Sequence, residues 1–328
     1  MGGSDGQTLL LTGGSGYVAS VILQKFCRKY KADSPNTKLP GMEKISRVVL
    51  VDKFASSINE DDFTVPVQSF QGDITDLDFL SKVFAGADVV YHLASYGMSG
   101  REQLHNEMIW KVNVEGTKNV IEACRQNNVK SLIFTSTFNV VFGGQRIEDG
   151  DETLPYFDST ERSWDNYGNS KAVAEKLVLQ VNNTLTANGT TTISTCVLRL
   201  AGIYGPRERR HIPRVVKAMK QGMFLFTYGD NPIVEFVHVE NVVQALVQAQ
   251  YSLTHSNSVA AGKAYFISDG KPVNNFEFFR PLTEALDVPF PKISVPMWLV
   301  YFIGGFLFPS LSALFMVMVY LLCIASYM

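Results

Sequence analysis

Two side chains in the segment Tyr-Gly-Asn-Ser-Lys could work together as a base. Tyr167 and Lys171 are four residues apart, a spacing that places both side chains on one face of a helix. A phenol has a pKa near 10, and lowering it to about 7 costs roughly 4 kcal/mol. A neighbouring ammonium group can supply that energy in a partly dry cleft. With 13 tyrosines in the chain, pairs of tyrosine and lysine at this spacing also arise by chance. The position of this pair in the fold must therefore decide whether it is functional.

The elements that would position this pair form an alternating pattern. Short apolar runs alternate with helical stretches, which predicts an α/β fold: a doubly wound parallel (Rossmann) sheet covered on both faces. The expected strands are Thr8–Thr12, Arg47–Asp52, Val67–Gln71, Val89–His92, Ser131–Ser136 and Ile193–Leu198. Thr137 follows the fifth of them. Its hydroxyl is therefore expected at the carboxyl edge of the sheet, where open α/β sheets bind ligands.

A glycine-rich turn, Thr-Gly-Gly-Ser-Gly-Tyr-Val-Ala, directly follows the first expected strand. Gly13 and Gly16 allow a tight turn and let backbone N–H groups approach a pyrophosphate at the start of a helix. Ala19 stands at the third glycine site, where a small residue lets the helix pack close to the strand. The strand before the turn and the helix after it favour a dinucleotide site over an ordinary turn.

Carboxylates follow the second and third expected strands. Asp52 could accept hydrogen bonds from both hydroxyls of an adenosine ribose and would repel a 2′-phosphate. This favours NAD over NADP as the cofactor, although Lys53 beside it weakens the preference. Asp73 and Ile74 are placed for the adenine edge; the alternative role of Asp73 is to cap the helix that follows.

Taken together, these motifs resemble the extended short-chain dehydrogenase/reductase superfamily. The segments that carry the resemblance are the glycine turn, Asp73, Asn113–Thr117, Thr137, Tyr167–Lys171 and Leu198–Pro206. Three more segments look like subfamily 42E, relatives of the 3β-hydroxysteroid dehydrogenases: Ala94–Gln103, Thr135–Gln145 and Phe266–Pro281. The sequence departs from the superfamily pattern at Leu200, where proline is common, and mildly at Ala19.

The resemblance implies a role for each candidate residue. Tyr167 would be the proton acceptor with Lys171 as its partner. Thr137 would be the hydroxyl donor, and Asn113 would belong to the proton relay. The residues expected to bind the cofactor are Gly13, Gly16, Tyr17, Asp52, Asp73, Ile74, Ala94 and Lys171.

The substrate class needs its own argument, because many members of the superfamily act on nucleotide sugars. Those relatives commonly carry arginine where this chain has Val234, and a guanidinium there can pair with a sugar diphosphate. Losing that contact costs roughly 1.5 to 3 kcal/mol, although the cluster Arg207–Arg210 could compensate. Sterol-processing relatives resemble this segment better, and the apolar end of the sequence would hold the cleft near lipid. Together these features favour oxidation of a lipophilic, sterol-like alcohol, or reduction of its ketone. The alternatives are a nucleotide-sugar epimerase or dehydratase with tightly bound NAD, and an inactive NAD-binding relative.

Composition excludes several other classes. The 328 residues include 29 Lys and Arg against 31 Asp and Glu, so the basic excess expected of a nucleic-acid-binding protein is missing. Four dispersed cysteines without a C-x-x-C pair indicate a reducing compartment. The five histidines form no i,i+4 pair, so no metal site is expected. The sequence does not begin with a secretory signal pattern.

The last part of the sequence is of a different kind, because Ile293–Met328 contains no charged residue. As a helix, Met297–Met328 would be about 48 Å long, against a bilayer core of roughly 30 Å. This favours a membrane segment, either one span or an interfacial hairpin, over a buried core helix. The proteins that this sequence resembles continue beyond the apolar segment, whereas this sequence ends within it. The alternative is therefore that the sequence represents a truncated product.

The expected organisation has three parts. Residues 1–205 form an NAD-binding Rossmann domain, residues 206–296 a smaller substrate-binding lobe, and residues 297–328 the membrane segment. This predicts an enzyme at the endoplasmic reticulum membrane whose catalytic domain faces the cytosol. A homodimer is compatible with this organisation.

Overall fold

The computed structural model describes residues 6–27, 42–56, 62–157, 165–229, 231–255, 258–300 and 302. Contacts divide the chain into two compact units, and each unit is assembled from separate segments of the sequence. The first contains residues 1–143, 151–201 and 239–267. The second contains residues 144–150, 202–238 and 268–328.

Within the described residues, the first unit is built on an eight-stranded sheet with the strand order β12-β7-β5-β4-β1-β2-β3, and β6 pairs with β7. The strands are β1 (Gln7–Thr12), β2 (Ile45–Asp52), β3 (Val67–Gln71), β4 (Val89–His92), β5 (Ser131–Thr137), β6 (Thr184–Leu185), β7 (Thr192–Leu200) and β12 (Lys263–Ile267). All pairs are parallel except β6 with β7. The strand order reverses between β1 and β4, which makes their carboxyl ends the expected ligand crevice.

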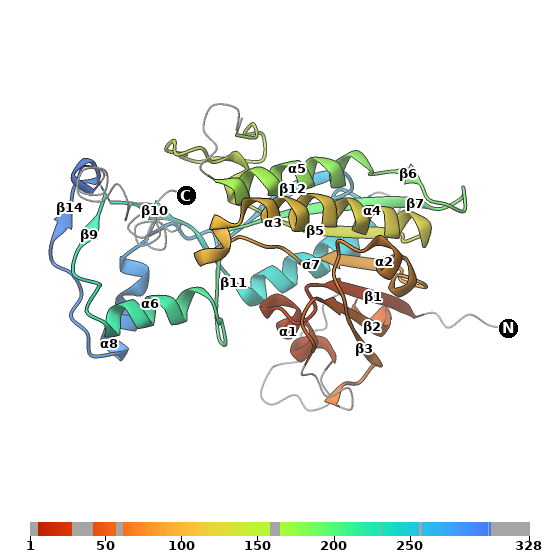
Figure 1. Cartoon of the computed structure of the whole chain (residues 1–328), viewed down its shortest axis with the longest axis horizontal. Helices are drawn as coiled ribbons and strands as arrows, with labels where there is room; N and C mark the ends of the chain where they lie inside the picture. Colours follow the sequence, from red (N-terminus) through yellow and green to blue (C-terminus); the bar gives the residue numbers. More distant parts are fainter. Residues whose placement is uncertain are drawn as a thin grey trace. The chain divides into compact units, whose positions relative to one another are not determined.

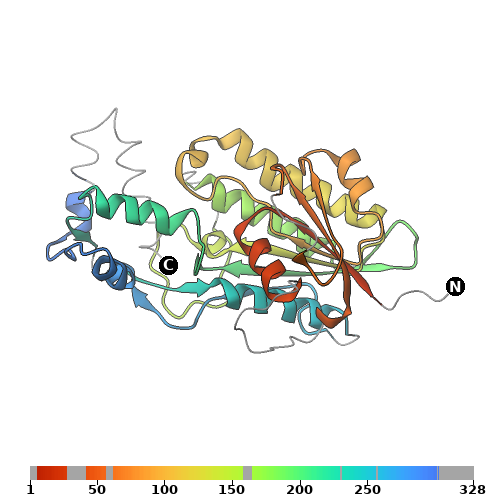
Figure 2. The same cartoon turned by 90° about the horizontal axis from the view of Figure 1, so that it is seen from below.

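Helices cover both faces of this sheet (Figures 1 and 2). One face carries α2 (Leu77–Val83), α3 (Asn106–Trp110), α4 (Gly116–Gln126) and α5 (Asn166–Gln180), and the other carries α1 (Tyr17–Ile22) and α7 (Val239–Leu253). Shorter helical turns are η1 (Leu23–Cys27), η2 (Met42–Lys44), η4 (Gly100–Leu104), η5 (Lys111–Glu115) and η6 (Phe138–Val141). Because both faces are covered, the central strands are continuous buried apolar runs, such as Leu9–Leu11. The predicted doubly wound fold is confirmed.

One strand differs from its expected place. The sequence pattern assigns a strand near Ala264–Ser268 to the smaller second region. In the structure this strand is β12, which pairs in parallel with β7 as an outer strand of the main sheet. It follows α7, so the chain returns to the first unit after residue 238. Local hydrophobic alternation cannot reveal which sheet a strand will join.

Where the structure describes it, the second unit contains three pairs of short strands and a small core. The pairs are β8 (Gly202–Tyr204) with β11 (Phe236–His238), β9 (Thr227–Tyr228) with β14 (Ser294–Val295), and β10 (Ile233–Val234) with β13 (Val273–Asn274). Its helices are α6 (His211–Lys220), η7 (Glu277–Phe279) and α8 (Arg280–Ala285). The buried core residues are Met219, Phe224, Tyr228, Phe276 and Val300.

Two expectations concern residues that the structure describes only in part. The polar stretch Lys31–Lys44 contains two prolines and a glycine, which predict a surface insertion before the second strand. It lies outside the described residues apart from η2. Of the expected membrane segment 297–328, only residues 297–300 and 302 are described. In the described part of the chain, no helix has the length and apolar character needed to cross a membrane.

Candidate active site

The glycine turn lies at the switch point of the sheet, directly after β1. Gly13 has φ of +72°, and a Cβ atom there would come within 2.9 Å of the backbone nitrogen of Ala94, which follows β4. The Gly16 N–H donates to the Gly13 carbonyl at 2.9 Å, and Gly16 precedes Tyr17, the first residue of α1. Ala19 is fully buried, as expected for close helix packing. The turn at Gly13 and Gly16, here called the glycine cradle, exposes backbone without side chains and fits a dinucleotide pyrophosphate.

Asp52 at the end of β2 is held beside this turn. Its carboxylate accepts hydrogen bonds from the backbone N–H of Ser15 at 3.0 Å and of Phe54 at 2.9 Å. The Lys53 ammonium is paired with the Asp73 carboxylate at 3.1 Å. The lysine that weakened the preference for NAD thus has its own carboxylate partner, while Asp52 is fixed where a ribose would be recognised.

Asp73 forms a turn at the end of β3 and does not cap α2. Its Oδ1 accepts from both the backbone N–H and the hydroxyl of Thr75, at 3.0 and 2.9 Å. Burial acts to raise the pKa of Asp73, but the hydrogen bonds from Thr75 and the charge of Lys53 outweigh it and lower the pKa. The cap of α2 is Asp76, which accepts from Phe79 N–H. Ile74 is buried in the core beside α4.

Tyr167 and Lys171 both lie in the first two turns of α5, and both are buried. Asp165 caps this helix by accepting from Gly168 N–H at 2.9 Å. The Lys171 Nζ atom lies 3.9 Å from the centre of the Phe134 ring on β5. Burial lowers the pKa of Lys171 to about 7, although the charge of Glu175 one turn later acts in the opposite direction. The helix therefore holds a lysine that titrates near neutral pH, one turn from a tyrosine.

Thr137 at the end of β5 is linked to the start of α5. Its Oγ1 accepts from Asn139 N–H at 3.3 Å and so caps η6. The Asn139 side chain then donates to the Asp165 carboxylate at 3.1 Å. Neither Asn139 nor Asp165 was among the predicted residues. An aspartate directly before a helix, as at Asp165, is the usual signal of an N-cap, whereas Asn139 lies within η6 and gave no such signal.

Asn113 lies in the π-helical turn η5, a feature frequent at functional sites. Its side chain accepts from Tyr96 N–H and donates to the Tyr96 carbonyl, both at 2.9 Å. It also donates to Ser170 Oγ at 2.9 Å, and Ser170 donates to the Tyr167 carbonyl at 2.8 Å. Asn113 is thus connected to α5, the helix that carries Tyr167 and Lys171.

A buried ion pair behind this helix was missed by the sequence reasoning. Arg199 on β7 donates to Glu175 Oε1 from Nε at 2.9 Å and from Nη2 at 2.8 Å, and the Tyr156 hydroxyl donates to the same oxygen at 3.0 Å. Both charged side chains are almost fully buried. The signal was an arginine inside the apolar run Cys-Val-Leu-Arg-Leu, because buried charges are found paired.

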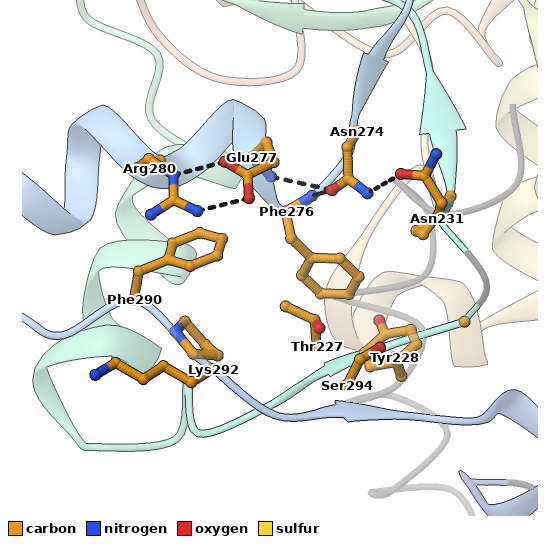
Figure 3. A pocket seen from close by; sticks show the side chains of 13 residues that line it. Thr227, Tyr228, Asn231, Asn274, Phe276, Glu277, Arg280, Phe290, Lys292 and Ser294 are labelled. Carbon is orange, nitrogen blue, oxygen red and sulfur yellow. Dashed lines mark hydrogen bonds and ion pairs between the residues drawn. The ribbon is translucent and has the colours of Figure 1, made fainter.

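A pocket of about 320 Å³ lies in the second unit (Figure 3). Arg280 donates to both carboxylate oxygens of Glu277 at 2.6 Å, and its guanidinium lies 3.9 Å from the centre of the Phe290 ring. Asn274 accepts from Glu277 N–H at 3.1 Å and donates to Asn231 at 2.8 Å. Each of the predicted catalytic and cofactor residues belongs to the first unit, and none of them lines this pocket.

A glycine cradle at the switch point, an aspartate at the end of β2 and a buried tyrosine and lysine one turn apart on α5 are the features of an NAD-dependent enzyme of the extended short-chain dehydrogenase/reductase type. The chain belongs to the 3-beta hydroxysteroid dehydrogenase/isomerase family, whose model matches residues 10–297. The resemblance seen in the sequence and the expected cofactor, NAD, are confirmed.

Named relatives agree with this family. The chain is 48% identical over 299 residues to the short-chain dehydrogenase/reductase family 42E member 1 of Xenopus laevis, covering 90% of this chain and 72% of that protein. It is 37% identical over 235 residues to the Arabidopsis thaliana 3beta-hydroxysteroid-dehydrogenase/decarboxylase isoform 1, covering 70% of this chain and 51% of that protein. The solved dTDP-glucose 4,6-dehydratase of Streptomyces venezuelae, with NAD and TYD bound, shares the fold. Its TM-score is 0.65 at 21% identity, over 88% of this chain and 84% of that chain.

Proposed function

We propose that this enzyme oxidises the CH–OH group of a steroid or sterol-like lipophilic alcohol, or reduces the corresponding ketone. Tyr167 takes the proton of the substrate hydroxyl as the hydride leaves the same carbon. NAD supplies the hydride acceptor when bound. The observation that carries the proposal is the burial of Tyr167 and Lys171 on one helix of the unit that holds the glycine cradle.

The other residues support Tyr167 in distinct ways. Lys171 brings a positive charge close to the phenol and favours its deprotonated form. Thr137 holds the substrate oxygen through its hydroxyl. Asn113 is connected to the Tyr167 backbone through Ser170 and so supports the helix that carries Tyr167. Its place in the relay that returns the proton to solvent follows from the resemblance to the superfamily.

The substrate class rests on two observations. The Arabidopsis relative is named a 3beta-hydroxysteroid-dehydrogenase/decarboxylase. Val234, which stands where nucleotide-sugar enzymes commonly carry arginine, is buried in β10 with 2% of its surface exposed. A sugar diphosphate would find no guanidinium at this position.

The second candidate function is a nucleotide-sugar epimerase or dehydratase with tightly bound NAD. The shared fold with the dTDP-glucose 4,6-dehydratase favours it, since the same sheet and switch point serve that enzyme. A third candidate, an NAD-binding relative without activity, is disfavoured by the intact Tyr167, Lys171 and Thr137.

One assay separates the three candidates. Membranes containing the full chain are incubated with NAD⁺ and either a panel of sterols and steroids or a panel of sugar nucleotides, and NADH absorbance is followed. Net NADH with a sterol supports the proposal. Sugar conversion without net NADH supports the epimerase or dehydratase, and no conversion of either panel supports the inactive relative.

Tyr167→Phe tests the catalytic assignment. Loss of the phenol should lower turnover by roughly 10²- to 10⁴-fold, as for loss of a general base, while NAD⁺ binding stays within a factor of about two. Tyr251→Phe, at a half-exposed tyrosine of α7, is the matched control and should retain full turnover. Retained turnover in Tyr167→Phe would refute the assignment.

We further propose that residues 297–328 attach the enzyme to the endoplasmic reticulum membrane with the catalytic domain facing the cytosol. The support is the uncharged sequence from Ile293 onward and the exposure of Trp298 at its start, since tryptophan favours the membrane interface. The test is alkaline extraction of membranes followed by protease treatment of sealed vesicles. Release by alkali, or protection of the catalytic domain, would contradict it.

A further inference from the structure

A buried histidine lies between the glycine turn and Asn113. His92 ends β4, where it is the register partner of Thr12 at the end of β1, and its side chain has no exposed surface. Its Nδ1 lies 2.7 Å from Thr12 Oγ1, and its Nε2 lies 2.9 Å from Thr117 Oγ1. The sequence reasoning did not single out His92, although a histidine at the end of an apolar strand is an unusual core residue.

The hydrogens in this chain of contacts can be assigned by counting donors. Thr117 Oγ1 lies 2.6 Å from the Asn113 carbonyl, which can only accept, so the single proton of Thr117 is used there. Thr117 must then accept from His92 Nε2, which therefore carries a proton. A neutral imidazole has one such proton, so Nδ1 accepts from the Thr12 hydroxyl. Thr12 Oγ1 in turn accepts from the backbone N–H of Ala94 at 3.3 Å.

Each hydroxyl in this arrangement donates once and accepts once, so the chain has a single direction. It begins at the N–H of Ala94, whose backbone nitrogen would lie 2.9 Å from a Cβ atom on Gly13, and ends at the carbonyl of Asn113. The Asn113 side chain continues through Ser170 to the backbone of Tyr167. All of these residues belong to the first unit.

We infer that His92 is a positioning residue, held as the neutral Nε2–H tautomer, that couples the glycine turn to Asn113 and thereby to the helix of Tyr167 and Lys171. An imidazole accepts at one ring nitrogen and donates at the other, so His92 can join the two threonine hydroxyls, whereas an apolar side chain can do neither. Burial, with a smaller effect from the charge of Lys171, lowers the pKa of His92 to about 3, so the ring stays neutral at physiological pH.

The charged and titratable groups around His92 agree with a neutral ring. Lys171 approaches from α5, and its Nζ lies over the Phe134 ring, whose centre is 5.3 Å from that of His92. The His92 side chain contacts Thr12 from β1, Thr117 from α4 and Phe134 from β5. A second proton would give the His92 ring a positive charge close to that of Lys171. It would also occupy Nδ1, so Thr12 could no longer donate its hydroxyl hydrogen to that atom.

The first test reads the tautomer directly. The full chain is labelled with ¹⁵N-histidine, and two-dimensional NMR is recorded from pH 6 to 8 without and with NAD⁺. The His92 signals are assigned by their absence in His92→Gln, or by contacts to Thr117 if that variant does not fold. The expected spectrum has Nε2 protonated and Nδ1 bare throughout. A protonated Nδ1, or a ring charged in this range, would overturn the inference.

The second test asks whether His92 couples the glycine turn at one end of the hydrogen-bonded chain to Asn113 at the other. Thr117→Val removes the acceptor for Nε2–H, so the ring should change to the other tautomer or to a mixture, and NAD⁺ should bind about 10-fold more weakly. Thr117→Ser keeps the hydroxyl and should restore both readouts. Thr12→Val should weaken NAD⁺ binding by a similar factor, and the double variant should be no weaker than the worse single variant.

Additive losses of NAD⁺ affinity in the Thr12→Val/Thr117→Val double variant, or an unchanged His92 tautomer in Thr117→Val, would overturn the inference. Either result would show that His92 only packs in the core. The readouts are the histidine tautomer and the affinity for NAD⁺, and none of them uses a sterol. Failure of these tests is therefore distinct from failure of the proposed substrate class.

Discussion

The ammonium nitrogen of Lys171 lies 3.9 Å from the centre of the Phe134 ring, with 1% of the lysine surface exposed. The aromatic face offers partial compensation for lost hydration, since a desolvated cation–π contact is worth about 2 kcal/mol. Burial still dominates and lowers the pKa of Lys171 to about 7. The catalytic helix thus holds a group whose charge changes in the physiological range.

This lowered pKa makes stability depend on pH. Between about pH 7 and pH 10 the unfolded chain binds a proton at this lysine that the folded chain does not, so the free energy of unfolding should rise with pH. From pH 7 to 9 the wild type should gain about 2 kcal/mol relative to Lys171→Met in urea unfolding. Lys176→Met, at an exposed lysine of the same helix, should show no such trend. If the difference in unfolding free energy between the wild type and Lys171→Met does not vary with pH, the lowered pKa of Lys171 is contradicted.

Gly13 should be sensitive to a single added methyl group. Gly13→Ala gives a residue with a side chain a positive φ and places its Cβ within 2.9 Å of the Ala94 backbone nitrogen, so both stability and NAD⁺ affinity should fall. Gly86→Ala is the matched control, because Gly86 has φ of +75° but open space around it. The control should lose about 1–2 kcal/mol from backbone strain alone and bind NAD⁺ normally. Equal losses in the two variants would show that the close approach is unimportant.

Asp52 should set the cofactor preference. Asp52→Asn keeps an acceptor for Ser15 N–H or Phe54 N–H but removes the negative charge that repels a 2′-phosphate. The ratio of NADP⁺ to NAD⁺ affinity should rise by about 10-fold, the equivalent of roughly 1.4 kcal/mol. Asp76→Asn, which alters the cap of α2, should change stability and leave this ratio unchanged. Competition titrations with the two dinucleotides measure it.

Breaking the buried pair of Arg199 and Glu175 should be costly. Arg199→Met leaves an uncompensated buried carboxylate and should lower the free energy of unfolding by about 3–5 kcal/mol. Adding Glu175→Gln removes that charge, keeps an acceptor for Tyr156, and should recover most of the loss. Lys118→Met breaks an exposed pair with Glu115 and should cost less than about 1 kcal/mol. Chemical unfolding that finds no recovery in the double variant would contradict this account.

Local spacing was sufficient for much of the site. A turn that needs positive φ demands glycine, a strand end places Asp52 and Thr137 at the sheet edge, and the helical repeat puts Tyr167 and Lys171 on one face. These constraints act between residues that are close in the sequence, so they can be inferred from the sequence alone. They predicted the doubly wound sheet and the residues expected at the NAD site, whereas the family was inferred from the resemblance of the motifs to a known superfamily.

Tertiary structure decided the contacts that join distant segments. Thr12 meets His92 across 80 residues only because β1 and β4 are adjacent with that register, and β12 joins the main sheet only because α7 leads the chain back to β7. The Lys53–Asp73 pair and the Arg199–Glu175 pair depend in the same way on which strands and helices become neighbours. A sequence states which groups can pair, whereas burial and strand register determine which of them do.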